Sequence, residues 1–225
     1  MAINKGYHAP GDLPPVIPVF PLAGVLLLPR GELPLNIFEP RYLAMIDDIL
    51  AEDRVVGMIQ PWIGPNGPDT SEPPALCDIG CAGRLTALQE TGDGRYLITL
   101  TGISRFRVVE ELPVETPYRQ CRVSAAPFAG DFSARQGEDA VDRDRLLATL
   151  HDFLEANGME TDWESINRAS NETLVNALSM LSPYGPREKQ ALLEAADLDT
   201  RAEVLIAVTE MALARAGDEP GPSLQ

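Results

Sequence analysis

The spacing of apolar residues changes near residue 128. Before this point, apolar residues form short runs separated by glycine and proline, which is typical of β-strands. After it, they recur every three or four positions, which is typical of amphipathic helices. The pattern therefore predicts an α+β protein in which a β-rich part precedes an α-rich part. The expected strands span residues 16–20, 25–28, 54–60, 76–90, 95–110 and 119–127, with Gly102 as a bulge or tight bend.

The stretch from Phe20 to Tyr42 is strongly apolar but contains four prolines. Proline cannot donate to a strand ladder, so it is confined to edge strands, strand starts and bulges. We therefore expect short, irregular strands here, with turns at residues 23–24 and 29–32. Large apolar side chains usually pack inside a protein, and those expected mainly in the core are Leu26, Leu28, Leu35, Ile37 and Phe38.

One helix is expected within the β-rich part, at about residues 40–52. Pro40 fits the first helical position, where its missing N–H costs nothing. The apolar residues that follow have helical spacing and would share one face: Tyr42, Met45, Ile46, Ile49 and Leu50. This helix would cover one side of the strands.

The α-rich part is expected to contain helices at 141–156, 171–181, 186–196 and 200–215, with a short one beginning near Thr161. Thr161 with Glu164, and Thr200 with Glu203, have the spacing of a capping box. The expected boundaries are a flexible tail at 1–12, the β-rich part at 13–127, a linker at 128–138, the helical part at 139–216 and a second flexible tail at 217–225.

Charge argues against a nucleic-acid partner. The net charge is −16, and residues 128–225 carry −11 of it. Such a field repels phosphate backbones and anionic lipid surfaces, so no nucleic-acid or membrane partner is expected. RNA binding stays open as an alternative because the β-rich part contains a set of arginines, two of which would share one strand face: Arg105 and Arg107, with Arg84, Arg95, Arg119 and Arg122 in addition.

The cysteines and the N-terminus point to a cytoplasmic protein. An odd number of cysteines without a secretory signal is typical of a reducing compartment. The apolar run at 22–28 is far shorter than the ~20 residues that span a bilayer. Cys77 and Cys81 are spaced C-x-x-x-C, which differs from a zinc knuckle. We therefore expect these two and Cys121 to be small buried thiols.

The sequence lacks the motifs of common catalytic sites. It has neither a phosphate-binding loop with its lysine nor a G-x-S-x-G motif. Both lysines, Lys5 and Lys189, have ordinary polar neighbours along the chain. The histidines are His8, in the expected tail, and His151, on an expected helix surface. No catalytic residue, cofactor or metal site is predicted.

Exposed apolar residues are the candidate binding site. Residues 61–74 contain five prolines and two glycines, so they are expected to form a surface loop, and this loop holds Trp62 and Ile63. Phe128 and Phe132 flank the expected linker. Exposed aromatic residues can anchor a protein partner. The alternative is that each folds back onto the core.

Three stretches together resemble the N-terminal, substrate-recognition domain of Lon proteases, particularly its stand-alone bacterial members. They are LPPVIPVFPLAGVLLLPRGELPLNIFEPRYLAMID (13–47), CAGRLTAL (81–88) and YLITLTGISRFRVVE (96–110). The later segment EKQALLEAADLDTRAEVL (188–205) also resembles the family. The resemblance implies a PUA-like β-barrel at 13–127 with one covering helix, followed by an α-helical bundle.

The resemblance also implies a function. The family recognises polypeptides, so the implied partners are unfolded or degron-bearing polypeptides, together with a protease or chaperone. The ATPase and Ser-Lys peptidase modules of Lon do not fit in this chain, and the protein is expected not to be an enzyme. A non-catalytic adaptor or chaperone-like factor is therefore the favoured function.

Overall fold

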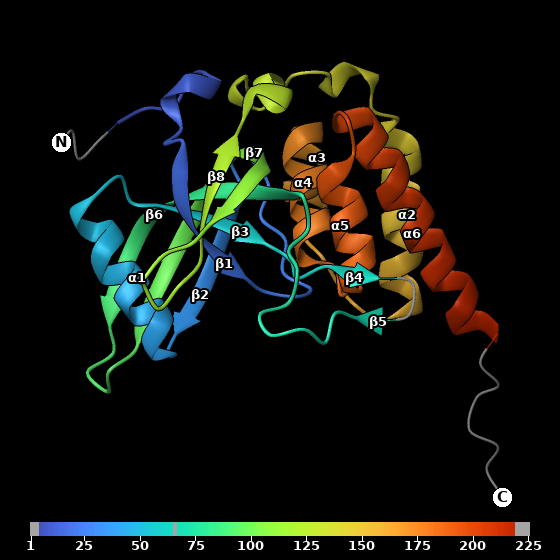
Figure 1. Ribbon diagram of the computed structural model, residues 1–225. Helices are drawn as coiled ribbons and strands as arrows, with labels where there is room; N and C mark the ends of the chain where they lie inside the picture. Colours follow the sequence, from blue (N-terminus) through green and yellow to red (C-terminus); the bar gives the residue numbers. More distant parts are fainter. Residues whose placement is uncertain (1–4, 65–66, 219–225) are drawn as a thin grey trace, which may run out of the picture.

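The strands form one sheet that closes on itself. The computed structural model describes residues 5–64 and 67–218. Within these residues a six-stranded sheet has the order β2-β7-β6-β3-β1-β8, and β7 also pairs with β8, which completes a ring (Figure 1). Its strands are β1 (Val16–Pro21), β2 (Glu32–Ile37), β3 (Val55–Ile59), β6 (Ile79–Glu90), β7 (Tyr96–Leu112) and β8 (Gln120–Ser124). A small two-stranded sheet contains β4 (Ile63–Gly64) and β5 (Gly67–Pro68).

Strand β7 closes the ring because it is long enough to have different partners along its length. Its first half pairs with β2, from Tyr96 to Thr101, and its second half pairs with β8, from Arg107 onward. Gly102 lies between the halves. The register against β6 shifts beside it, which confirms the irregularity predicted there. The Gly102 amide donates to Gly31 O at 2.8 Å, and Arg30 N donates to Gly102 O at 2.8 Å.

The prolines of β1 are tolerated because each half of this strand pairs with only one neighbouring strand. Val16–Pro18 pairs with β8, and Val19–Pro21 pairs with β3. In the strand order, β1 lies between two other strands. Each half of β1 nevertheless has one side without a paired strand, and a proline on that side removes no inter-strand hydrogen bond. The proline-rich sequence is therefore compatible with a closed sheet.

Two predictions for the apolar stretch are wrong. Residues 25–28 do not form a strand: they are irregular, and the second strand is β2 instead. Leu26, Leu27 and Leu28 are nevertheless buried, so apolar composition here reflects burial and not strand pairing. Phe38 was expected in the core but is 60% exposed. It follows Ile37, which is buried, and successive side chains of an extended chain point to opposite sides.

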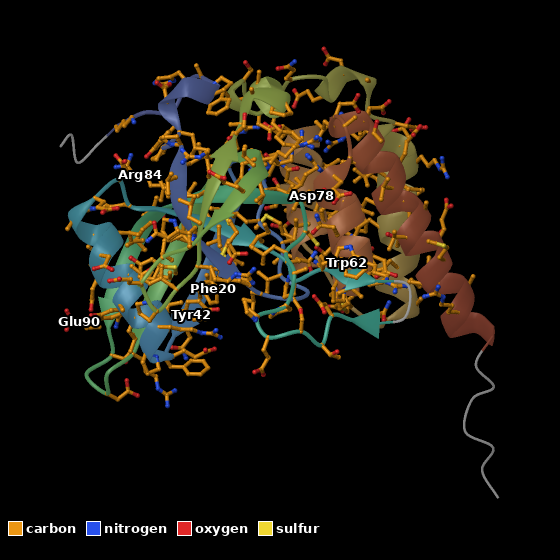
Figure 2. All side chains as sticks on the ribbon, viewed as in Figure 1. Phe20, Tyr42, Trp62, Asp78, Arg84 and Glu90 are labelled. Carbon is orange, nitrogen blue, oxygen red and sulfur yellow. The ribbon has the colours of Figure 1, made fainter. Side chains whose placement is uncertain are left out.

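Helix α1 (Pro40–Ala51) covers one side of the sheet, as predicted (Figure 1). It begins at Pro40 and buries Tyr42, Met45, Ile46 and Ile49. The Tyr42 ring packs against Phe20 of β1, with ring centroids 4.0 Å apart (Figure 2). The helical spacing read from the sequence therefore identified the buried face correctly.

The remaining helices gather on the other side of the sheet (Figure 1). They are α2 (Arg143–Ala156), α3 (Trp163–Arg168), α4 (Asn171–Leu181), α5 (Pro186–Glu194) and α6 (Leu198–Asp218). Of three short 3-10 helices, η1 (Pro10–Asp12) and η2 (Ala126–Phe132) contact each other, and η3 (Glu138–Ala140) contacts α4 and α6. Helix α6 packs against α2, α4 and α5. One continuous cluster of buried side chains joins α1, the strands and these helices, so the two parts share a core.

The capping residues differ from those predicted. Asp162, not Thr161, caps α3 and accepts the amides of Glu164 and Ser165. Asp197, before α6, accepts Thr200 N at 2.8 Å, so this helix begins ahead of the predicted start at Thr200. Aspartate is as good an N-cap as threonine, and the neighbouring aspartates take this role.

The segments expected to be a tail and a linker make defined contacts. In residues 5–12, Lys5 Nζ donates to Asp12 O at 2.8 Å and Tyr7 packs against the core. Residues 217–218 of the second predicted tail belong to α6, and the rest of the predicted tails, 1–4 and 219–225, lies outside the described residues. The predicted linker at 128–138 contains Asp131, which is buried in η2. The division at this segment stays a prediction.

Arg105 and Asp131 form a buried ion pair. Arg105 is 4% exposed. Its Nε and Nη2 atoms each donate to one Asp131 carboxylate oxygen at 2.9 Å, and its backbone N donates to Asp131 Oδ2 at 2.9 Å. Arg105 Nη1 also donates to Leu193 O at 3.2 Å and to Ala195 O. The pair therefore fastens η2 to β7 and to the end of α5.

Lys189 is buried, in contrast to the polar surroundings expected from its sequence neighbours. It is 2% exposed, and its Nζ donates to Ser179 O at 2.7 Å and Met180 O at 2.8 Å. Both carbonyls belong to the last turn of α4, where a cation is favourable. Burial lowers the pKa of Lys189 to about 8.

Burial of Lys189 should make stability depend on pH. Between pH 8 and about 10.4 the unfolded chain retains the lysine proton and the folded protein releases it, so stability rises with pH in this window. We expect the free energy of unfolding of the wild type, relative to Lys189→Met, to increase by up to about 3 kcal/mol across it. Urea denaturation of both proteins at several pH values measures this, and a constant difference would contradict it. The subtraction removes tyrosine titration, which the two proteins share.

Candidate functional site

A groove of about 360 Å³ lies between the segments flanking β4 and helix α5. Trp62 stands at this junction of the strands and helices (Figure 2). The groove combines apolar surface with charged and amide side chains. Its lining residues are Gln60, Pro61, Trp62, Ile63, Cys77, Asp78, Pro186, Arg187, Gln190, Ala191 and Glu194.

Gln60 fixes the base of the groove. It follows β3 and is buried. Its Nε2 donates to Pro186 O and to Gln190 Oε1, both at 3.0 Å, while its Oε1 accepts Gly24 N at 2.8 Å. A buried amide is stable only when its polar atoms have partners. Gln60 therefore holds the start of α5 at a fixed position relative to β3.

Helix α5 supplies the opposite wall. Gln190 Nε2 donates to Ile79 O at 3.1 Å and to Glu194 Oε1 at 2.7 Å. Arg187 donates to Gly64 O. These bonds join α5 to β6 and β4, so both walls of the groove are held by the fold.

The proline-rich loop holds Trp62 in an ordered position. Trp62 N donates to Ala75 O at 2.8 Å, and Cys77 N donates to Gln60 O at 2.9 Å. Asp69 accepts the amides of Ala75 and Ser71, and these bonds lower its pKa. Hydrogen bonds within the loop therefore hold its conformation.

The Trp62 indole packs against neighbouring backbone and is also partly exposed to solvent. A side-chain carbon at Gly64 would lie 2.5 Å from the indole, so the ring lies against the Gly64 backbone. The side chain is nevertheless 48% exposed. An aromatic ring that is ordered and still exposed loses little conformational entropy on binding, which favours a role as an anchor.

The groove carries charges of both signs. Arg187 lies on one wall, and Asp78 and Glu194 provide negative charge. Burial, with further contributions from Glu194 and Asp78, raises the pKa of the Cys77 thiol to about 11, so it stays a neutral thiol near pH 7. Within residues 5–64 and 67–218, no group of three or more His, Cys, Asp or Glu side chains could hold a metal ion.

The structure brings together two of the four predicted binding residues. Trp62 and Ile63 both line the groove. Phe128 lies elsewhere, half-buried, with the Arg105 guanidinium 4.7 Å from its ring centroid. Phe132 packs against the core, as the alternative of folding back predicted. A binding role for these four residues stays a prediction.

Sequence reasoning missed the wall formed by α5. Pro186, Arg187 and Gln190 are distant from Trp62 along the chain, and no local pattern connects them. Gln60 offered the only signal, since a polar residue ends an otherwise apolar strand there. The other two cysteines are buried, and burial raises the pKa of both thiols, that of Cys121 to about 11.

Most of the arginines considered for RNA binding form hydrogen bonds or ion pairs with other residues of this protein. Arg105 is buried against Asp131, which corrects its expected exposed position beside Arg107. Arg84 donates to Lys5 O. Three more form ion pairs with neighbouring carboxylates: Arg95 with Asp93, Arg119 with Glu111 and Arg122 with Glu110. The RNA-binding alternative therefore gains no support.

Solved structures of Lon N-terminal domains share this fold. The Lon N-terminal domain protein from Xanthomonas campestris aligns with a TM-score of 0.59 at 22% identity, covering 85% of this chain and 97% of that chain. The N-terminal domain of the Mycobacterium avium complex Lon protease aligns with a TM-score of 0.62 at 18% identity, covering 87% and 98%. The fold is therefore that of a Lon-type N-terminal domain.

The family follows from the sequence. The family model described as the ATP-dependent protease La (LON) substrate-binding domain matches residues 16–209. Because this match covers most of the chain, the protein belongs to the LON substrate-binding domain family. This confirms the resemblance seen in the sequence.

The curated relatives are longer proteins. Lon protease 2 of Myxococcus xanthus is 29% identical over 199 residues, which cover 87% of this chain and 23% of that protein. Lon protease of Anaeromyxobacter dehalogenans is 26% identical over 199 residues with the same coverage. The chain thus spans about a quarter of the length of these relatives. In its described part, the protein has no helix with the length and apolar character needed to cross a membrane.

Proposed function

We propose that this protein recognises unfolded or degron-bearing polypeptides, without catalysis, through the groove beside Trp62. The observation that carries the proposal is an exposed indole held in place at the edge of a groove of about 360 Å³. Membership of a substrate-binding family supports the polypeptide as ligand class.

The groove chemistry fits an extended segment with one large apolar side chain. Trp62, Ile63 and Pro186 provide apolar contact, and tryptophan is enriched among residues that dominate binding energy. Arg187 offers donors for a carboxylate, and Asp78 with Glu194 can accept from a basic side chain. A segment with an apolar residue beside charged neighbours would match both features.

The cellular role we propose is that of an adaptor or chaperone-like factor in the cytoplasm. It would hold such segments for a protease or chaperone. No cofactor or metal has a part in this proposal. In agreement with a non-catalytic role, casein incubated with the protein, with or without ATP, should stay intact; cleavage would contradict it.

Trp62→Ala should weaken polypeptide binding at least tenfold, because removal of an aromatic anchor that dominates binding costs about 2 kcal/mol or more. The measurement is fluorescence anisotropy of labelled, reduced casein titrated with protein. Trp163→Ala is the matched control, since Trp163 is partly exposed but lies on α3 and not in the groove. Equal affinities of the two variants would refute the groove as the site, and no binding by the wild type would refute the function.

A further inference from the structure

The wall of the Trp62 groove that α5 supplies has opposite charges at its two ends. Arg187, Gln190, Ala191 and Glu194 follow one another at helical spacing, so they share one face of α5, and all four line the groove. A helix rises 1.5 Å per residue, which separates Arg187 from Glu194 by about 10 Å along the axis. The neutral amide of Gln190 lies between the two charges.

The positive end lies beside Trp62. Arg187 donates to Gly64 O, and the Gly64 backbone is the surface against which the Trp62 indole packs. This bond holds the guanidinium close to β4. Arg187 therefore contributes positive charge at the same end of the groove as the exposed ring.

The negative end lies around Cys77, which is bonded to the start of the proline-rich loop: Cys77 Sγ donates to Pro61 O at 3.7 Å. Burial is the largest cause of the raised pKa of the Cys77 thiol, and Glu194 and Asp78 both raise it further. One carboxylate precedes β6 and the other ends α5, so two distant segments place negative charge at the same point.

Both carboxylates are available to a ligand. Asp78 and Glu194 are exposed. Across residues 5–64 and 67–218, neither forms an ion pair with a basic side chain. Glu194 Oε1 accepts only the neutral amide of Gln190, at 2.7 Å. A cation can therefore bind here without displacing an existing ion pair.

Helix stability does not explain these two charges. A helix favours negative charge in its first turn and positive charge in its last turn. In α5 the order is reversed, since Arg187 is the second residue and Glu194 is the last. Arg105 and Arg201 bind carbonyls at this end of α5 from the buried side, and neither forms an ion pair with Glu194.

The dimensions of the groove suit a short pattern of side chains. In an extended segment, side chains two positions apart point to the same side and lie about 6–7 Å from each other. The flexible stem of a lysine or arginine spans the remaining distance. A segment whose apolar side chain packs on Trp62 can therefore bring a basic side chain to Asp78 and Glu194.

We propose that the groove selects segments in which a lysine or arginine lies two positions from a large apolar residue. The apolar side chain packs against Trp62 and Ile63, and the basic side chain binds between Asp78 and Glu194. An acidic residue in the same place would be repelled, which makes the two carboxylates specificity determinants. This inference rests on the proposed function and narrows the class of segment that the groove accepts.

Three labelled peptides test the charge preference by fluorescence anisotropy. Each carries one phenylalanine in a glycine-serine background and differs only two positions later, where it has lysine, glutamine or glutamate. Acetylated and amidated ends remove the terminal charges. At about 0.05 M salt we expect the lysine peptide to bind about threefold more tightly than the glutamine peptide and about tenfold more tightly than the glutamate peptide. The differences should shrink at about 0.5 M salt, because exposed charges are screened.

Isosteric variants locate the preference. Asp78→Asn combined with Glu194→Gln keeps the shape of the groove and removes both charges, so the lysine and glutamine peptides should then bind equally. Glu90→Gln is the control, because it removes an exposed carboxylate at the end of β6, far from Trp62 (Figure 2). It should keep the wild-type preference. Trp62→Ala should weaken all three peptides by a similar factor, since they share the apolar contact.

Each contrary outcome overturns a defined statement. Equal affinities of the wild type for the three peptides, or binding to none of them, would overturn the charge selection. A preference for glutamate would overturn it and assign recognition to Arg187. A lysine preference that survives in the double variant would overturn the role of Asp78 and Glu194. Casein binding by the wild type separates these failures from failure of the proposed function, which predicts that casein binds in every case.

Discussion

Gly102→Ala should destabilise the protein by about 3 kcal/mol or more. A side-chain carbon at this position would lie 2.0 Å from Leu28 O and 2.7 Å from Leu28 C. These are backbone atoms that cannot rotate away. Relief would require separating the chain before β2 from β7, which would break the bonds between Gly102 and its neighbours Arg30 and Gly31.

Urea denaturation of the wild type and Gly102→Ala measures this effect. Gly11→Ala is the matched control, because a side-chain carbon at Gly11 would meet nothing within 4 Å. It should change the free energy of unfolding by less than about 0.5 kcal/mol. A similarly small change in Gly102→Ala would show that the chain does not pass this closely over β7.

Asp131→Ala should cost about 3–5 kcal/mol of stability, because it leaves the Arg105 guanidinium buried without a carboxylate. Two side-chain donors and the backbone N of Arg105 lose their acceptor together. The loss should also free η2 from β7, so protection of this segment from hydrogen exchange should fall.

The control for this prediction is the exposed pair of Arg122 and Glu110. Glu110→Ala should cost at most about 1 kcal/mol, as expected for a solvated ion pair. Combining Asp131→Leu with Arg105→Met should recover part of the stability, because a buried pair can be replaced by apolar contact. A loss below about 1 kcal/mol for Asp131→Ala would contradict the buried pair.

The elements with strong local signals were predicted well. Helix α1 was expected at 40–52 and spans Pro40–Ala51, because its proline start and apolar face both arise from adjacent turns. The long hairpin formed by β6 and β7 also follows from its strand-like runs and the glycines of its turn. The strand predicted at residues 25–28 is wrong because the leucines there serve burial in the core and not strand pairing.

The sequence indicated only one wall of the candidate groove. Trp62 and Ile63 stood out because apolar residues in a proline-rich loop have no local reason to be there. Helix α5, which forms the facing wall, carries residues that look like an ordinary solvated helix. Burial of Arg105 and Lys189 was not predicted either, since a charged residue gives no local sign that a partner will bury it.

The sequence by itself determined the β-then-α organisation, the start and buried face of α1, and membership of the LON substrate-binding domain family. These depend on periodicity and motifs, which are properties of neighbouring residues. Tertiary structure alone decided that Arg105 meets Asp131, that Gln60 meets α5 and that Arg201 keeps a buried donor with no partner among the described residues. Such pairings join distant segments, and their energies depend on burial that exists only after the chain has folded.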